Sequence, residues 1–224
     1  MDVFSRKKVH QVAVIGLGSF GDAVGRELTA LGDRVLGVDL DGDRVSGLEG
    51  NYDSIIQLDA REESAIQEIG LEDYDAVIVA IGKDAESSVF VTMNVLDRKC
   101  PRVWVKAQSS IHERILRRVG AHHVFLPEAQ FGRHVAQLVH NPYMLGFMEL
   151  GSDHQIARLA VPEDYVGRNA VSVTELAGED LFCLAVLRDG VIIRDAPEQE
   201  ELRERDELIV YGLRATLRHL TDQL

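Results

Sequence analysis

A glycine-rich loop near the beginning of the chain sets the strongest limit on how the chain can fold. The loop reads Gly-Leu-Gly-Ser-Phe-Gly at positions 16–21 and directly follows the apolar run 12–15. A helical pattern starts after the loop and continues to about Leu31. The spacing Gly-x-Gly-x-x-Gly between a buried strand and a helix is typical of the turn that holds the diphosphate of a nucleotide.

The three glycines and a later aspartate have separate roles in such a site. Gly16 permits the tight turn, Gly18 lets the backbone approach a diphosphate, and Gly21 lets the helix pack closely on the strand. The N-terminus of that helix offers unpaired N–H groups and the positive end of a helix dipole. Asp39 ends the next apolar run, where a carboxylate accepts hydrogen bonds from ribose hydroxyls. The sequence therefore predicts a site for an adenosine nucleotide.

The charges around Asp39 predict which nucleotides fit. Asp41 lies two residues further on, and we expect no arginine nearby. Two carboxylates repel a 2′-phosphate, so NADP is disfavoured, whereas NAD(H), ATP, ADP and AMP remain. Asp59 and Ala60 end the third apolar run and are expected to border the adenine, although a strand-end cap explains Asp59 equally well.

Apolar runs alternate with helical stretches through the first 140 residues. This pattern predicts an α/β fold class: a Rossmann-like, doubly wound parallel sheet covered on both faces. The expected strands are 12–15, 34–39, 54–59, 76–81, 102–107 and 123–126, and the expected helices are 19–31, 41–50, 85–99 and 111–119.

The pattern changes after Pro127. A helix is expected over 128–140, followed by a small α+β domain of about 80 residues. Asp189-Gly190 between two apolar runs predicts a β-hairpin. The expected strands are 156–161, 181–187, 191–194 and 207–211, and the expected helices are 171–176 and 213–220.

Composition excludes several classes of protein. The 37 acidic and 24 basic residues give a net charge of −13, which disfavours a nucleic-acid partner. No run of about 18 apolar residues is present, so we expect no membrane span. Cys100 and Cys183 do not form a C-x-x-C pair, which favours a reducing, cytoplasmic compartment.

The residues after His140 favour a sensor over an enzyme. A dehydrogenase needs an acid–base group and an anion clamp from a substrate domain. This segment contains His154 and His219 but no Ser/His/Asp or Cys/His grouping. We therefore expect no catalysis and no catalytic residue; the alternative is a small NAD(H)-dependent oxidoreductase.

Motifs distributed along nearly the whole chain resemble one family. They are residues 13–21, 35–39, 77–82, 103–108 and 119–121, Pro127-Glu128 with Gly132 and Ala136-Gln137, Ala196-Pro197, and residues 205–208. The chain resembles the RCK domains (regulators of K+ conductance, also called TrkA-N plus TrkA-C), in particular the cytosolic regulatory subunit of Ktr-type bacterial K+ uptake systems.

The resemblance implies a three-part organisation. Residues 1–127 would be the Rossmann-like TrkA-N lobe, 128–150 a crossover helix and hinge, and 151–224 a TrkA-C-like dimerisation and ligand-sensing domain. Homodimers would assemble into an octameric ring on the inner face of the membrane. There a K+-translocating subunit would respond to ATP/ADP-dependent changes in the shape of the ring.

The resemblance also assigns site residues. Lys106 would contact a phosphate, and Glu128 would join a divalent ion, Mg2+, near the γ-phosphate; the alternatives are a surface lysine and an acid favoured by the helix dipole. With the glycine loop, the expected nucleotide contacts are Gly16, Gly18, Ser19, Phe20, Gly21, Asp39, Leu40, Asp59, Ala60, Ala80, Ile81, Gly82 and Lys106.

Two features qualify which ligands the resemblance implies. Relatives that discriminate ATP from ADP commonly carry an arginine where this chain has Ser19, which makes NAD(H) or AMP more credible ligands. Some relatives bind cyclic di-AMP through the C-terminal domain, so a cyclic di-AMP receptor is a further alternative. The corresponding segments here are 166–171 and 186–193.

Overall fold

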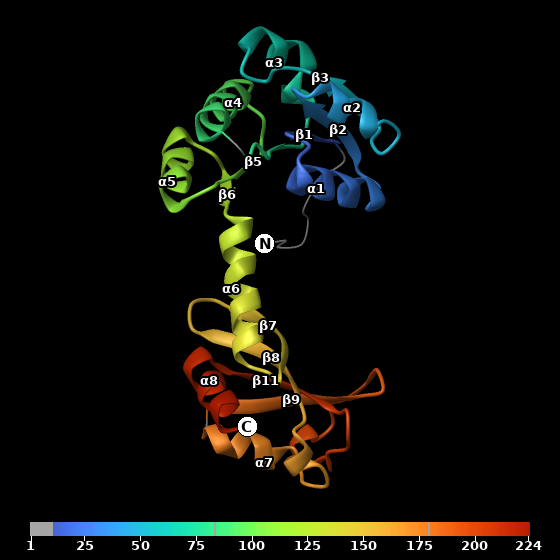
Figure 1. Ribbon diagram of the computed structural model, residues 1–224, viewed down its shortest axis with the longest axis vertical. Helices are drawn as coiled ribbons and strands as arrows, with labels where there is room; N and C mark the ends of the chain where they lie inside the picture. The colour runs from blue at the N-terminus through green and yellow to red at the C-terminus, as the bar shows by residue number, and fades with distance from the viewer. Residues whose placement is uncertain (1–10, 83, 179) are drawn as a thin grey trace, which may run out of the picture. The chain divides into compact units, whose positions relative to one another are not determined.

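The structure is a computed structural model that describes residues 11–82, 84–178 and 180–224. The chain divides into two units after Gln130 (Figure 1). The N-terminal unit contains a six-stranded parallel sheet with the strand order β3-β2-β1-β4-β5-β6. This order is that of a Rossmann-like, doubly wound sheet, so the predicted fold class is confirmed. The strands are β1 Gln11–Ile15, β2 Arg34–Asp39, β3 Ser54–Gln57, β4 Ala76–Val79, β5 Val103–Lys106 and β6 His123–Phe125.

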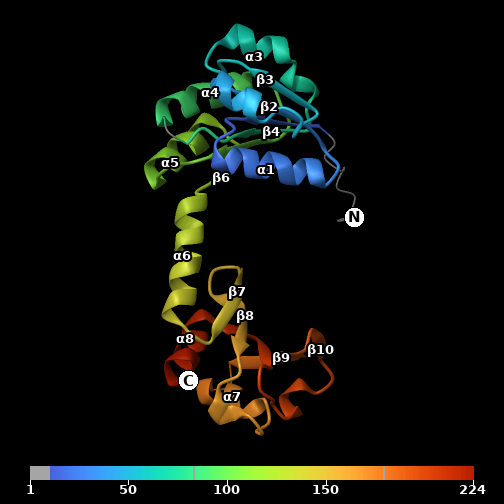
Figure 2. The ribbon, with the colours of Figure 1, turned by 45° about the vertical axis from the view of Figure 1, so that its right-hand side comes forward.

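Helices cover both faces of this sheet because alternate residues of each strand point to opposite sides. In β1, Val12 and Val14 face α1, whereas Ala13 and Ile15 face α3 and α4. Figures 1 and 2 show α1 on one face and α3 and α4 on the other. The helices are α1 Ser19–Ala30, α2 Gly42–Gly47, α3 Glu63–Ile69, α4 Ala85–Asp97, α5 Ser110–Val119 and α6 Pro127–His140.

The structure differs from the sequence prediction in two details of this unit. Helix α3, which has seven residues and buries Ile66, was not predicted. The strands expected to end at 59, 81 and 107 are shorter, ending at Gln57, Val79 and Lys106. The residues beyond those strand ends form the loops that carry the predicted site.

The C-terminal unit contains a five-stranded antiparallel sheet with the order β10-β9-β11-β8-β7. One face packs on α7 and α8 through Val173, Leu217 and Leu220, which confirms the predicted α+β domain. Its elements are β7 Met144–Leu150, β8 His154–Ala160, α7 Val171–Thr174, β9 Leu181–Arg188, β10 Val191–Ile193, β11 Glu207–Leu213 and α8 Arg214–Gln223.

The hairpin between β9 and β10 is the predicted one. Asp189 and Gly190 both have positive φ, 49° and 79°, as a two-residue type I′ turn requires. Strand β7 was not predicted, since its residues were expected to form a hinge. Its pairing with β8 is irregular between Met144 and Gly146, which weakens the alternation that marks a strand.

None of the helices in the described residues is long and apolar enough to cross a membrane.

Candidate functional site

The predicted site residues lie at the carboxyl ends of the parallel strands, around the point where the strand order reverses. Strands β1 and β4 are neighbours there, and the chain leaves them in opposite directions along the sheet. The Gly16 N–H donates to the carbonyl of Val38 (2.8 Å) and the Ala80 N–H to that of Ile15 (2.7 Å). Ligands of open α/β sheets bind at such a switch point.

The fold requires two of the three loop glycines. Gly16 has φ +93°, and a Cβ there would lie 3.1 Å from the carbonyl carbon of Ala80. A Cβ on Gly21 would overlap the carbonyl oxygen of Gly16. A Cβ on Gly18 would meet nothing within 4 Å. The fold explains the glycines at 16 and 21, but it leaves open space beside Gly18.

Helix α1 begins beside that open space. Gly18 occupies its N-cap position, and no side chain caps the helix. Ser19, Phe20 and Gly21 form the first turn, whose N–H groups have no partner within the helix. The arrangement offers hydrogen-bond donors and a positive dipole end to an anion.

Asp39, at the end of β2, is buried and held in one orientation. Its Oδ2 atom accepts the Leu17 N–H at 2.6 Å, and its Oδ1 atom accepts the Asp41 N–H at 2.9 Å. These bonds join the carboxylate to the glycine loop. The residue is 7% exposed, so its orientation is fixed by the fold.

The expectation that no arginine lies near Asp39 was wrong. Arg44 Nη1 lies 3.1 Å from Asp39 Oδ2, and Arg44 Nη2 lies 3.5 Å from Asp41 Oδ2. The Asp41 side chain caps α2 by accepting the N–H groups of Asp43 and Arg44, and this short helix returns Arg44 to Asp39. One cation faces two carboxylates, so we still expect the site to reject a 2′-phosphate.

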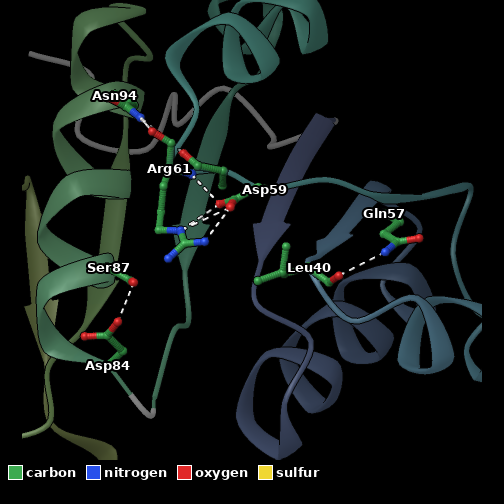
Figure 3. Close-up of polar contacts among 8 residues, drawn as sticks. Leu40, Gln57, Asp59, Arg61, Asp84, Ser87 and Asn94 are labelled. Carbon is green, nitrogen blue, oxygen red and sulfur yellow. Dashed lines mark hydrogen bonds and ion pairs between the residues drawn. The ribbon is translucent and has the colours of Figure 1, made fainter.

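Asp59 and Ala60, which were expected to border adenine, lie in the loop after β3, and the expected nucleotide contact Leu40 lies in the loop after β2. Figure 3 shows Asp59 and Leu40. The Asp59 carboxylate forms a bidentate ion pair with Arg61, with a shortest distance of 2.6 Å. The Arg61 guanidinium holds the pKa of the Asp59 carboxyl below its usual value. Ala60 is buried, whereas Leu40 is exposed and its carbonyl accepts a hydrogen bond from Gln57 at 3.1 Å.

The loop of Asp59 is also tied to helix α4. Asn94 Nδ2 donates to the carbonyls of Ala60 (3.2 Å) and Arg61 (2.9 Å). Asp84 caps the same helix and accepts the Ser87 hydroxyl at 2.5 Å, which lowers the pKa of Asp84. The sequence analysis missed Arg61 and Asn94. The spacing Asp-x-Arg could have indicated the first of these contacts.

Lys106, at the end of β5, forms an ion pair with Glu128 in the first turn of α6. The lysine is 8% exposed, so it is not a surface lysine, whereas the Glu128 side chain is 68% exposed. The Lys106 ammonium holds the pKa of the Glu128 carboxyl below its usual value. The structure thus joins the predicted phosphate contact to the predicted metal ligand.

Aromatic rings connect this ion pair to the glycine loop. Lys106 Nζ lies 5.5 Å from the centre of the Phe20 ring, and the Phe20 and Phe125 ring centres are 5.2 Å apart. A Cβ on Gly82 would lie 3.3 Å from Lys106 Nζ. The ammonium group is therefore next to the loops that follow β1 and β4. Phe125, which sequence reasoning missed, completes this contact.

The residues around Glu128 do not form a metal cage by themselves. No group of three or more His, Cys, Asp or Glu residues that could hold a metal ion occurs among the described residues. A divalent ion at Glu128 would need most of its oxygen ligands from phosphate and water, which Mg2+ accepts readily. Ile81 lies at the edge of the apolar core and supplies no ligand atom from its side chain.

Comparison with known proteins identifies the family. The TrkA-N domain model matches residues 12–127, more than half of the 224 residues. The Ktr system potassium uptake protein A of Vibrio alginolyticus is 34% identical over 200 residues, 89% of this chain and 90% of that protein. The protein of the same name from Bacillus subtilis is 28% identical over 218 residues, 97% of this chain and 98% of that protein.

Solved structures agree on the fold. The RCK domain of GsuK superposes with a TM-score of 0.64 at 14% identity, over 96% of this chain and 48% of that chain. The GsuK channel bound to NAD has a TM-score of 0.61 at 15% identity, over 96% of this chain and 39% of that chain. The present chain therefore spans half or less of those structures. From the domain match and the relatives, the chain belongs to the TrkA-N domain family.

Proposed function

We propose that this chain is a nucleotide-sensing regulatory subunit that gates a K+-translocating membrane protein and catalyses no reaction itself. The observation that carries the proposal is the convergence of three features at one end of the sheet. They are an uncapped helix N-terminus, the buried Asp39 carboxylate and the buried Lys106 ammonium. Two relatives that align over most of the chain are named as potassium uptake proteins, which supports the partner.

In this proposal Asp39 binds the ribose of an adenosine nucleotide. Among the described residues, its Oδ1 atom accepts one hydrogen bond, from the Asp41 N–H, so a lone pair remains for a ribose hydroxyl. The phosphates lie at the first turn of α1, where Gly18 leaves space for them. The adenine lies against Leu40 and Ala60, beside the Asp59 loop.

Lys106 would respond to the number of phosphates. A terminal phosphate beside Gly82 would compete with Glu128 for the Lys106 ammonium, because both are oxyanions that seek the same buried cation. Glu128 is mostly exposed and can turn away from Lys106. Its carboxylate and the phosphate would then hold Mg2+, which supplies charge neutralisation between them.

Helix α6 would transmit the effect of this exchange at Lys106 to the C-terminal unit. Glu128 lies in its first turn, and the helix continues past Gln130. Further along α6, Phe131, Val135 and Val139 recur every four residues and are exposed, which supports pairing with α6 of a second copy. We propose that such dimers form an octameric ring at the cytoplasmic membrane face.

The ligand can gate its partner only by binding one shape of the ring better than the other. Ser19 at the start of α1 supplies no positive charge to a γ-phosphate. A charge-assisted hydrogen bond contributes about 1.5–3 kcal/mol, so discrimination between ATP and ADP would rest on Lys106. NAD(H) and AMP, which also fit an Asp39 site, are tested beside them.

The experiment is a titration of the full chain with ATP, ADP, AMP and NADH, each with and without Mg2+, followed by melting temperature and calorimetry. A ligand at about 100 times its Kd stabilises the folded state by about 2.7 kcal/mol, which is readily measured. We expect a shift with at least one nucleotide and its loss in Asp39→Ala.

Two results would contradict the proposal. One is the absence of a shift with every nucleotide, or an equal shift in Asp39→Ala. The other is turnover of NADH with a carbonyl substrate, which would favour the oxidoreductase alternative. Mass spectrometry of the nucleotide retained by the purified chain identifies the natural ligand directly.

A further inference from the structure

A cavity lies entirely within the C-terminal unit. It has a volume of about 180 Å³ and lies between the last turn of α6, the strands β7 and β8, and α8. The residues that line it are Ala136, Gln137, His140, Asn141, Met144, Gln155, Arg214, Leu217 and Arg218. None of these lining residues is acidic, although the whole chain carries 37 acidic residues against 24 basic ones.

A buried amide in the wall of this cavity has no hydrogen-bond partner among the described residues. Gln155, in β8 between β7 and β11, is 1% exposed. Within the described residues, its Nε2 atom has no hydrogen-bond partner. A buried N–H group without a partner is costly, and folded proteins normally supply one. The Gln155 amide can therefore donate a hydrogen bond to a bound ligand.

Arg214, at the start of α8, supplies a second such donor. Its Nη2 atom donates to Glu149 Oε1 at 2.9 Å, which fixes the guanidinium at the cavity wall. Its Nε atom is buried and, in the described part of the chain, unpartnered. The Gln137 carbonyl in the last turn of α6 already accepts two hydrogen bonds from Asn141, at 3.1 and 3.2 Å.

The cavity is small and partly apolar. Ala136, Met144 and Leu217 form the apolar part of its wall. A cavity of about 150 Å³ is known to admit benzene, whereas sites for drug-sized ligands span about 300–1,000 Å³. A single ring or a short aliphatic chain therefore fits this volume, and a cyclic dinucleotide does not.

We propose that this cavity binds a small organic anion, with its anionic head on Arg214 and Gln155 and a short apolar body against Met144 and Leu217. The proposal is independent of the nucleotide site. It gives the C-terminal unit a small-molecule ligand of its own, bound next to the end of α6.

The test is a calorimetric titration of the full chain at constant ionic strength with three probes. Benzoate carries both the anionic head and the apolar body, inorganic phosphate carries only an anion, and benzyl alcohol keeps the ring without the charge. We expect benzoate to bind measurably and at least about tenfold more tightly than either of the other probes, because only benzoate satisfies both parts of the cavity.

Two variants locate the binding. Arg214→Gln should weaken benzoate binding about tenfold. Its matched control is Arg158→Gln, which removes one similarly exposed guanidinium and one ion pair, to Glu207, without touching the cavity. Gln155→Leu should raise the melting temperature of the ligand-free chain, because it removes the unpartnered amide, and should weaken benzoate binding. A purely structural glutamine would behave oppositely on stability.

The outcomes are distinct. The proposal is supported if benzoate binds more tightly than the other probes and if its binding is weakened by Arg214→Gln and by Gln155→Leu but not by Arg158→Gln. Equal binding of benzoate and benzyl alcohol, or of benzoate and phosphate, overturns it. Equal effects of the two arginine substitutions also overturn the proposal. The absence of benzoate binding does so too, and this result is expected if a side chain of a second copy of the chain fills the cavity. Asp39→Ala, which disables the nucleotide site, should leave benzoate binding unchanged.

Discussion

The two ends of the proposed nucleotide site are built differently. At the glycine loop, Asp39 is buried, and its carboxylate accepts hydrogen bonds from two backbone N–H groups and from the Arg44 guanidinium. Gly21 packs so closely on Gly16 that no side chain fits there. At the other end, the buried ammonium of Lys106 relies on Glu128, whose side chain is 68% exposed. The first end is fixed by packing and backbone hydrogen bonds. The second depends on a partner that solvent already reaches.

In the proposed function, this difference means that Asp39 recognises the ligand and that the Lys106–Glu128 pair responds to it. A preorganised carboxylate binds ribose at little entropic cost, because nothing has to be ordered first. A cation whose partner can be exchanged can instead report which ligand is present. We therefore expect substitutions at the glycine loop to affect folding and affinity. Substitutions at the Lys106–Glu128 pair should change how binding depends on phosphate number and Mg2+.

The largest effect is expected for Gly21→Ala. The added methyl group would overlap the Gly16 carbonyl oxygen, so α1 must move away from β1. Forcing an extra carbon into a packed site costs about 1–3 kcal/mol, and a backbone clash lies at the upper end. Urea unfolding should show a loss of about 3 kcal/mol.

Gly18→Ala is the matched control for that substitution. It adds the same methyl group three residues earlier, where nothing lies within 4 Å. Its unfolding free energy should stay within about 0.5 kcal/mol of the wild type, while nucleotide affinity falls. Equal destabilisation by the two substitutions would mean that both glycines serve only the fold.

The second effect in size is expected for Asp39→Asn. The amide keeps the shape of the carboxylate but loses its charge and replaces one acceptor oxygen with an NH2 donor. A ribose hydroxyl and Arg44 therefore each lose a charge-assisted contact, and one of the N–H groups of Leu17 and Asp41 loses its acceptor. Nucleotide binding should weaken by about 1.5–3 kcal/mol in calorimetry. Asp41→Asn is the control, because that side chain also contacts Arg44 and an asparagine still caps α2. A similar loss in both variants would place the ribose elsewhere.

The sequence was sufficient to predict the local structure of the rigid end of the proposed site. The residue pattern at 16–21 and Asp39 has a local cause, a strand followed by a tight turn and a helix, and the structure has that arrangement. Arg44 was missed because its return to Asp39 depends on the short capped helix α2. A six-residue helix leaves too weak a periodic signal for its side chains to be placed.

At the other end of the proposed site, the sequence predicted the two residues of the Lys106–Glu128 pair but not their contact. Lys106 and Glu128 were each assigned through the family resemblance, and neither pattern indicated that they pair. Their contact requires that the end of β5 and the start of α6 lie together, which is a tertiary property. Strand β7 was missed for a similar reason, because its irregular pairing with β8 hides the alternation that marks a strand.

A smaller effect is expected for Glu128→Gln. The substitution removes the competitor of a phosphate for Lys106 but leaves a side chain of the same size. Affinity for ADP without Mg2+ should rise several-fold, and Mg2+ should no longer enhance ATP binding. Glu63→Gln is the matched control, since its carboxylate is 69% exposed and pairs with the largely buried Arg98 outside the site. Identical behaviour of both variants would contradict the exchange at Lys106.

The smallest effect is the pH dependence of the Lys106–Glu128 ion pair. The ammonium lowers the pKa of Glu128 in the folded chain, so the pair stabilises the fold above the unfolded-state pKa of about 4.3. That stabilisation is lost as the pH falls through the folded-state pKa. Because Glu128 is mostly exposed, the contribution should be below about 1 kcal/mol.

Urea unfolding of the wild type and Glu128→Gln at several pH values measures this contribution, because the two chains differ only in this carboxyl group. The difference in unfolding free energy should be constant from neutral pH down to about pH 5 and should shrink below about pH 4. Added salt should reduce it at neutral pH, since an exposed pair is screened. A difference that persists in acid and in salt would mean that Glu128 holds α6 by packing, and the pair could then not serve as the exchangeable end of the site.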